Sequence, residues 1–261
     1  MFERWDRFKR LVGTGLSFLT FGLGGLLLRL VYFPVLRLLV RDAESQARYA
    51  RLAIHHAFRG FIGLMRVLGV LEYRIEGIER LQRPGLLILA NHPTLIDVVF
   101  LISLVPNANC VVKGSLARNP FTRGPVTATG YITNSAGGTE LVTDCIASLE
   151  AGDNLIIFPE GTRTPVGGEM KLQRGAANIA VRGGCNITPV VIRCEPLSLT
   201  KGQPWWKIPF RRVRFTIEVR EDIPVEPFLD ASQQEAALAA RRLTDYLHGY
   251  FSKETFVYAG S

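Results

Sequence analysis

Residues 86–97 read LLILANHPTLID, and this stretch decides the fold. Its first five residues are apolar without interruption, which is typical of a strand buried on both faces of a sheet. Comparable runs follow as YRIEGIE (73–79), NCVV (109–112), LIIF (155–158), ITPVVIR (187–193) and VRFTIEV (213–219). Apolar residues at helical spacing lie at 93–105, 138–151, 173–183 and 231–252. We predict an α/β domain, a mixed sheet covered by helices, with functional residues where strands lead into helices.

The composition is that of a folded protein with one sizeable core. The chain has 261 residues, of which 48% are hydrophobic and 21% charged, which excludes disordered, collagen-like and small disulfide-rich proteins. The four cysteines, Cys110, Cys145, Cys185 and Cys194, show no C-x-x-C pair and no histidine at metal-ligand spacing. We therefore expect no metal site and no disulfide framework, but buried thiols in a reducing compartment.

The net charge of +8 is concentrated in two blocks of the chain. Residues 1–60 hold ten Lys and Arg against four Asp and Glu, and residues 171–214 hold nine against one. Because these basic residues alternate with long apolar runs and aromatic side chains, they favour anionic membrane lipids over nucleic acid as the partner. One such stretch is WWKIPFRRVR (205–214), which suits the bilayer interface or the acidic face of an acyl carrier protein; a solvated loop with inward-packed tryptophans is an equal alternative.

The N-terminal segment is long and apolar enough to interact with a membrane. Eighteen uncharged residues separate Arg10 from Arg29, about 27 Å as a helix. We predict a broken or re-entrant pair of helices in one leaflet rather than one clean span, because the segment contains five glycines and is followed by Pro34 and several arginines. The basic residues on both flanks predict that both ends face the cytoplasm. We thus expect residues 1–64 to form a membrane-associating segment, peripheral or re-entrant on the cytoplasmic face of the inner membrane, and residues 65–261 a catalytic domain. A buried helix of a soluble core is the alternative.

Two strand ends carry residues suited to catalysis. Asn91 and His92 follow the strand LLILA, with Asp97 five positions after the histidine, so an imidazole and a carboxylate come within reach of each other as a general base and its partner. A histidine that only caps a helix is the alternative. The strand LIIF leads into FPEGTRT, where Glu160 and Arg163 suit a head group with hydroxyls and phosphate, or else form a local ion pair.

Together these segments resemble the lysophosphatidate (1-acyl-sn-glycerol-3-phosphate) acyltransferase family of the PlsC type, whose members share N-H-x-x-x-x-D and F-P-E-G-T-R blocks in this order. The resemblance covers residues 65–220 and implies His92 as general base and Asp97 as its partner. It also implies an acceptor-binding loop at Glu160, Gly161, Thr162 and Arg163. Further similarity lies in TPVVI (188–192), and in Asn91, Lys113, Lys171 and Arg174, which we expect to bind substrate.

One block departs from the family pattern. Where the family has the seven-residue block G-x-x-F-I-D-R, with the arginine on the acceptor's phosphate, residues 130–135 read GYITNS. With one residue fewer after the glycine, Asn134 and Ser135 replace the acid and the base. Lys113, Arg163, Lys171 or Arg174 would then compensate, or the acceptor is not an ordinary lysophosphatidate. Related sequences occur in bacterial pathways that build unusual acyl lipids such as aryl polyene lipids.

The resemblance implies an O-acyltransferase without a cofactor or metal. The co-substrate would be acyl-CoA or an acyl carrier protein thioester, and the acceptor a lysophospholipid-like alcohol, which would become phosphatidate if it is 1-acyl-sn-glycerol-3-phosphate. Backbone amides near Gly161 or the Lys113 ammonium are candidate oxyanion donors. A non-catalytic lipid-binding protein of the same fold is the rival hypothesis, whereas a hydrolase lacks support because the chain has no G-x-S-x-G elbow.

Overall fold

The structure is a computed structural model that describes residues 2–118, 122–134, 138–165, 167–229 and 236–256. Seven strands form one sheet: β1 Leu71–Glu76, β2 Leu87–Ala90, β3 Asn109–Val112, β4 Ile132–Thr133, β5 Leu155–Ile157, β6 Ile187–Glu195 and β7 Val213–Val219. The α-helices are α1 Phe2–Leu27, α2 Phe33–Leu39, α3 Ala43–Val67, α4 Asp97–Leu104, α5 Gly114–Arg118, α6 Arg123–Thr129, α7 Gly138–Glu150, α8 Gly175–Gly183 and α9 Ala236–Phe256. A π-helical turn, η1 Leu28–Tyr32, joins α1 to α2, and short 3-10 turns lie at η2 Ile78–Leu81 and η3 Glu226–Phe228.

The sheet is mixed, as predicted. Its order is β1-β7-β6-β2-β5-β3-β4, and only the β6–β7 pair is antiparallel. The five strands from β6 to β4 run in one direction, so their carboxyl ends meet at the same edge. The central strands β2 and β5 are buried at every position, which is why their sequences are uninterrupted apolar runs.

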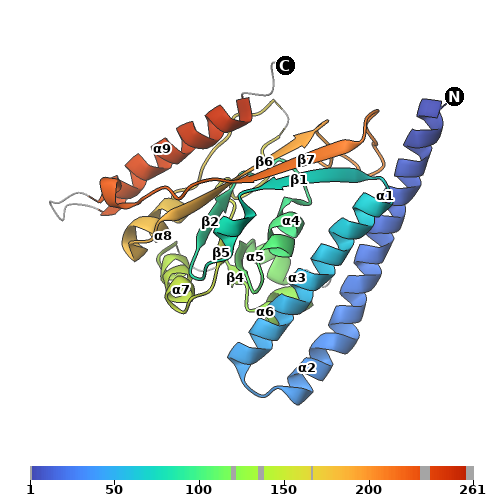
Figure 1. Cartoon of the computed structure of the whole chain (residues 1–261). Coiled ribbons are helices and arrows are strands. Elements are labelled where there is room, and N and C mark those ends of the chain that lie inside the picture. The colour runs from blue at the N-terminus through green and yellow to red at the C-terminus, as the bar shows by residue number, and fades with distance from the viewer. Residues whose placement is uncertain (1, 119–121, 135–137, 166, 230–235, 257–261) are drawn as a thin grey trace.

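Helices cover both faces of the sheet (Figure 1). On one face α3 and α4 enclose a core that includes Met65, Phe100 and Phe215. On the other face α7, α8 and α9 enclose a second core around Leu89, Leu243 and Phe251. The domain therefore has three layers, and burial on both faces holds the strand ends rigidly in place.

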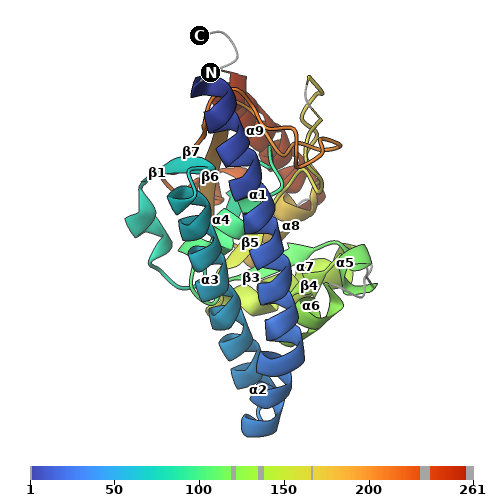
Figure 2. The ribbon, with the colours of Figure 1, turned by 90° about the vertical axis from the view of Figure 1, so that its right-hand side faces the viewer.

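The N-terminal segment forms a helical hairpin, with α1 alongside α3 (Figure 2). The expected break near Pro34 is not there: the chain stays helical from Phe2 to Leu39 and reverses only at residues 40–42. The wider π-helical turn just before Pro34 accommodates the ring and the missing N–H of the proline without ending the helix. The expected boundary between residues 64 and 65 falls inside α3, and that division into domains stays a prediction.

The face of α1 that packs against the rest of the protein consists of small or polar residues. Gly13, Thr14 and Ser17 are buried there, and the two hydroxyls donate to carbonyls one turn back in the same helix. Arg10 is also buried, and its guanidinium donates to the carbonyls of Pro209, Phe210 and Arg211 at 2.9, 2.6 and 2.8 Å. The helix is thus fixed by polar contacts to a loop about 200 residues away in sequence.

The opposite face of α1 is apolar and exposed. Its large side chains without cover include Phe8, Val12, Leu16, Leu19, Leu23 and Leu27. The helical run Arg4–Leu39 is long and apolar enough to cross a membrane by length and composition, and only 17% of its most apolar window is buried. This distribution is the inverse of a soluble amphipathic helix, whose apolar face packs inward.

Candidate active site

The predicted base and its partner are in contact. His92 follows β2, and Asp97 is the first residue of α4, so the intervening turn folds the two side chains together. His92 Nδ1 lies 2.9 Å from Asp97 Oδ2. A carboxylate can only accept, so Nδ1 carries the hydrogen and Nε2 presents its lone pair. The ring also stacks on Phe158, with centroids 4.3 Å apart, which fixes its plane.

Asp97 is completely buried and held by three donors. Besides His92, the backbone N–H of Thr94 donates to Oδ2 at 2.6 Å and the Thr94 hydroxyl donates to Oδ1 at 2.5 Å. Burial raises the pKa of Asp97, while the hydrogen bonds from His92 and Thr94 act in the opposite direction. The result is a fixed acceptor that orients the imidazole for proton transfer.

Sequence reasoning missed Thr94. Its side chain is fully buried and touches Asp97, so it positions the carboxylate. The available signal was the T-x-x-D spacing of Thr94 and Asp97 directly before the apolar run 98–104, the pattern of a capping box.

Glu160 joins the second motif to the first. Its Oε1 accepts from the backbone N–H of His92 at 2.7 Å, and its Oε2 accepts from the Thr164 hydroxyl. The side chain is 5% exposed. These contacts hold the two loops together, since β2 and β5 are neighbours and their carboxyl ends adjoin, and contact of Glu160 with substrate hydroxyls stays a prediction.

Arg163 contacts a third segment rather than Glu160. Its Nη1 donates to the Leu199 carbonyl at 3.1 Å, and the same carbonyl accepts from Leu95 N at 3.0 Å. Among the described residues, Glu160 and Arg163 do not form the ion pair that was the alternative for this loop. The guanidinium is half-buried and keeps further N–H groups for an anion.

Gly161 and Asn91 both form hydrogen bonds with the protein backbone. Gly161 adopts φ +65°, and its N–H donates to the Phe158 carbonyl at 2.9 Å, so this amide is not free as an oxyanion donor. Asn91 is buried, and its side-chain amide both donates to and accepts from the backbone of Ile192, at 2.8 and 2.7 Å. Asn91 therefore ties β2 to β6 beside the histidine.

The remaining predicted cations and Thr162 are exposed at or near this edge. Lys113 directly follows β3, Thr162 lies in the loop after β5, and Lys171 and Arg174 lie on the segment leading into α8. What they bind stays a prediction. In the altered block, Asn134 Oδ1 accepts from Gly114 N at 2.9 Å, which fixes the turn that carries Lys113, whereas Ser135 lies outside the described residues. Within the described part of the chain, no group of three or more His, Cys, Asp or Glu residues is placed to hold a metal ion.

Comparisons with known proteins point to acyl transfer. The family described as Acyltransferase matches residues 72–193, which include both motifs. The chain is 28% identical over 179 residues to a 1-acyl-sn-glycerol-3-phosphate acyltransferase of Pseudomonas aeruginosa, covering 67% of this chain and 66% of that protein. It is 33% identical over 125 residues to the Helicobacter pylori protein of the same name, covering 45% and 52%. The chain thus spans just under two thirds and about half of the lengths of these relatives.

A solved structure shares the fold. The crystal structure of the 1-acyl-sn-glycerophosphate acyltransferase PlsC from Thermotoga maritima superimposes with a TM-score of 0.64 at 20% identity, covering 93% of this chain and 98% of that one. At this identity the likeness concerns the fold, including the N-terminal helices that precede the sheet.

Proposed function

We propose that the chain is an acyltransferase, since residues 72–193 match that family, and that it moves an acyl group from an acyl thioester to a hydroxyl of a lysophospholipid-like acceptor. The observation that carries the proposal is the His92–Asp97 pair at 2.9 Å, held by Thr94 and joined to the second motif through Glu160. The proposed acceptor is 1-acyl-sn-glycerol-3-phosphate, which would give phosphatidate.

The proposed reaction uses His92 as the general base. Nε2 takes the proton of the acceptor hydroxyl as its oxygen attacks the thioester carbonyl, and the imidazolium that forms is stabilised by the Asp97 carboxylate. The tetrahedral intermediate then expels the thiolate, which receives the proton back from His92. The donor is already activated, so positioning, base catalysis and oxyanion stabilisation supply the acceleration, and the reaction balances without a cofactor. The Lys113 ammonium is the remaining candidate oxyanion donor.

We propose that this reaction takes place at a membrane surface. The inverted distribution on α1, with polar residues inward and large apolar residues outward, leaves a surface that water solvates poorly and lipid solvates well. Trp206 and Phe210 extend this surface, both exposed, with the Arg7 guanidinium 5.0 Å from the Phe210 ring. Aromatic rings beside cations suit the head-group zone of anionic lipids, and we place the domain on the cytoplasmic side.

The altered block supports a second candidate, an acceptor other than lysophosphatidate in a specialised lipid pathway. Asn134 stands where the family has an acid, and its side chain serves to fix the Lys113 turn. A weaker phosphate site is then expected unless Arg163 and the exposed cations Lys113, Lys171 and Arg174 supply the charge.

A thiol-release assay tests the proposal. Full-length protein in vesicles receives acyl-CoA or acyl carrier protein thioester together with phosphorylated and non-phosphorylated acceptors. We expect acceptor-dependent release that His92→Ala lowers by at least about 10²-fold, the low end of what a positioned base contributes. His56→Ala, which removes an exposed histidine of α3, is the matched control. Release that His92→Ala leaves unchanged refutes the base, and no release with any donor–acceptor pair favours the lipid-binding hypothesis.

A further inference from the structure

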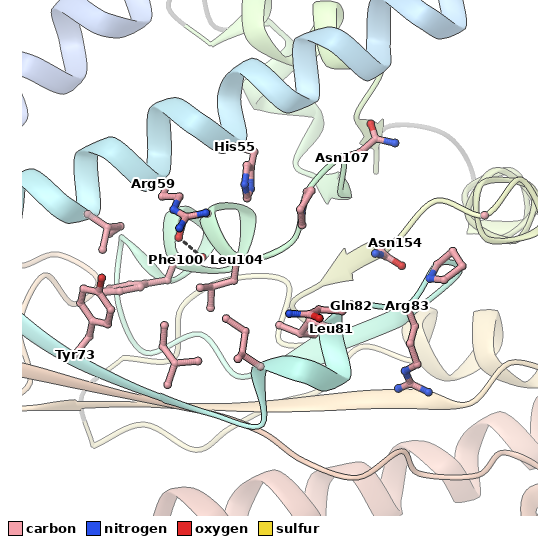
Figure 3. A pocket seen from close by; sticks show the side chains of 17 residues that line it. His55, Arg59, Tyr73, Leu81, Gln82, Arg83, Phe100, Leu104, Asn107 and Asn154 are labelled. Carbon is pink, nitrogen blue, oxygen red and sulfur yellow. Dashed lines mark hydrogen bonds between the residues drawn. The ribbon is translucent and has the colours of Figure 1, made fainter.

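A groove lies at the amino-terminal ends of β2, β3 and β5, whereas His92 and Glu160 follow the carboxyl-terminal ends of β2 and β5. Figure 3 shows this groove. It is formed by α3, β1, the end of α4 and the loops that precede β2, β3 and β5, and its volume is about 830 Å³. His92 and Asp97 are not among its lining residues. The two sites lie at opposite ends of α4, which begins at Asp97 and ends at Leu104, about 12 Å along the helix axis.

The groove carries positive charge without acidic side chains. Among the described residues, Arg59 and Arg83 line the groove, and no Asp or Glu does. Arg83 is neutralised by two hydrogen bonds to Asp222, at 2.9 and 3.0 Å, but no carboxylate of the described chain pairs with Arg59. His55 donates from Nδ1 to the Ile102 carbonyl, and burial lowers its pKa, so it is neutral at pH 7. The charge left over in the groove is that of Arg59.

The rest of the lining is divided between apolar and polar groups. The half-buried Tyr73, Ile75 and Leu104 form an apolar floor over the buried Ile62 and Phe100. Gln82, Asn107 and Asn154 supply polar groups (Figure 3). A small hydrophilic anion would gain nothing from the apolar side chains, and a neutral hydrocarbon would gain nothing from Arg59, which is exposed and has no carboxylate partner among the described residues. A volume of this size is within the usual range for sites that take a ligand of lipid or drug size.

We propose that this groove is a second, non-catalytic binding site for an amphiphile with one hydrocarbon chain and an anionic head group. The hydrocarbon chain lies on the floor formed by Tyr73, Ile75 and Leu104, and the carboxylate or phosphate monoester pairs with Arg59. A fatty acid and a lysophospholipid share this chemistry. The site needs neither acyl transfer nor the His92–Asp97 pair.

Photolabelling in neutral phosphatidylcholine nanodiscs tests the groove directly. The probe is a fatty acid with a diazirine on its chain, and labelled peptides of the full-length protein are located by mass spectrometry. We expect labels within residues 55–62 and 100–107. Arg59→Gln should lower them about tenfold at subsaturating probe, since a charge-assisted hydrogen bond is lost, and Leu104→Trp should abolish them by filling the groove.

Controls separate the groove from general lipid contact. Arg48→Gln removes an exposed arginine of the same helix outside the groove and should change nothing. Oleate and lysophosphatidate should compete with the probe, each identifying a usable head group, while monoacylglycerol should compete about tenfold less. Labelling that both groove substitutions leave unchanged, equal competition by monoacylglycerol, or competition by inorganic phosphate alone would each overturn the proposal. Because no catalysis is measured, failure of the acyltransferase proposal would leave this result interpretable.

Discussion

Asp97→Asn isolates the electrostatic part of the proposed base. An amide at this position has one acceptor and one donor end, and the surroundings decide its orientation. Thr94 N–H can only donate, so the amide oxygen must take the Oδ2 position, 2.6 Å from that nitrogen. The amide NH₂ then faces the Thr94 hydroxyl, which can reverse from donor to acceptor. His92 Nδ1 still finds an acceptor, so the tautomer is preserved and only the negative charge is lost.

The magnitude follows from the charge that disappears. Two unit charges about 4 Å apart at an effective dielectric constant of about 20 interact by about 4 kcal/mol. This stabilisation exists only when His92 is protonated in the transition state, so its loss should lower kcat by about 10³-fold. The KM for the acceptor should change little, because Asp97 is completely buried and makes no contact with solvent.

Steady-state kinetics of three variants check the reasoning. Thr94→Val keeps the carboxylate and the backbone donor but loses the hydroxyl, and should cost kcat less than tenfold. Combined with Asp97→Asn it leaves the amide NH₂ without an acceptor, so the double variant should be less stable than either single one by thermal unfolding. An Asp97→Asn enzyme with more than a tenth of the wild-type kcat would refute the electrostatic role, as would a Thr94→Val enzyme impaired as strongly as Asp97→Asn.

Substitutions at three further residues probe other contacts of the structure. Glu160→Gln keeps an acceptor for His92 N–H and should keep kcat within tenfold of the wild-type value. Glu160→Ala removes that acceptor and should lower kcat about 10²-fold in the thiol-release assay. Equal effects of the two variants would contradict the positioning role. Arg51→Met leaves the half-buried Asp153 carboxylate without its 2.8 Å partner and should destabilise the fold by about 3–5 kcal/mol, seen as a melting temperature about 10 °C lower; a change below about 2 °C would show that the pair contributes little. Burial lowers the pKa of His55, so below pH 6.5 the unfolded chain binds a proton more readily than the folded one, and stability decreases as the pH is lowered. His55→Gln should therefore reduce the drop in melting temperature between pH 6.5 and 5. An unchanged drop would exclude His55 as its source.

The strands that were predictable from sequence carry an uninterrupted apolar run or a regular alternation of apolar and polar residues. NCVV and VRFTIEV coincide with β3 and β7, because long apolar or alternating runs have one way to bury themselves. The two-residue β4 and the short helices α5 and α6 carry too few residues for any period to be recognised. The first five residues of the predicted 231–252 helix lie outside the described residues, and α9 itself continues to Phe256.

The site residues divide along a similar line. His92 and Asp97 are five positions apart in one turn, so local geometry was enough to predict their contact. The contacts of Glu160 and Arg163 depend on which strands are neighbours and on where the loop containing Leu199 returns, and neither fact is written in the local sequence. The prediction of a helix break near Pro34 was wrong because the sequence indicates strain at the proline but does not reveal the π-helical turn that relieves it.

The buried guanidinium of Arg10 also sets an order of events during synthesis. Its three acceptors, the carbonyls of residues 209–211, leave the ribosome about 200 residues after the arginine does. At a synthesis rate of about 5–20 residues per second, the carbonyls that bind Arg10 therefore become available roughly 10–40 s after the first helix. Throughout that interval α1 has only α3 to pack against, whereas a nearby bilayer accepts its exposed leucines at once. The nascent chain is then expected to reach the lipid before the sheet exists, so that folding of the sheet would follow membrane contact.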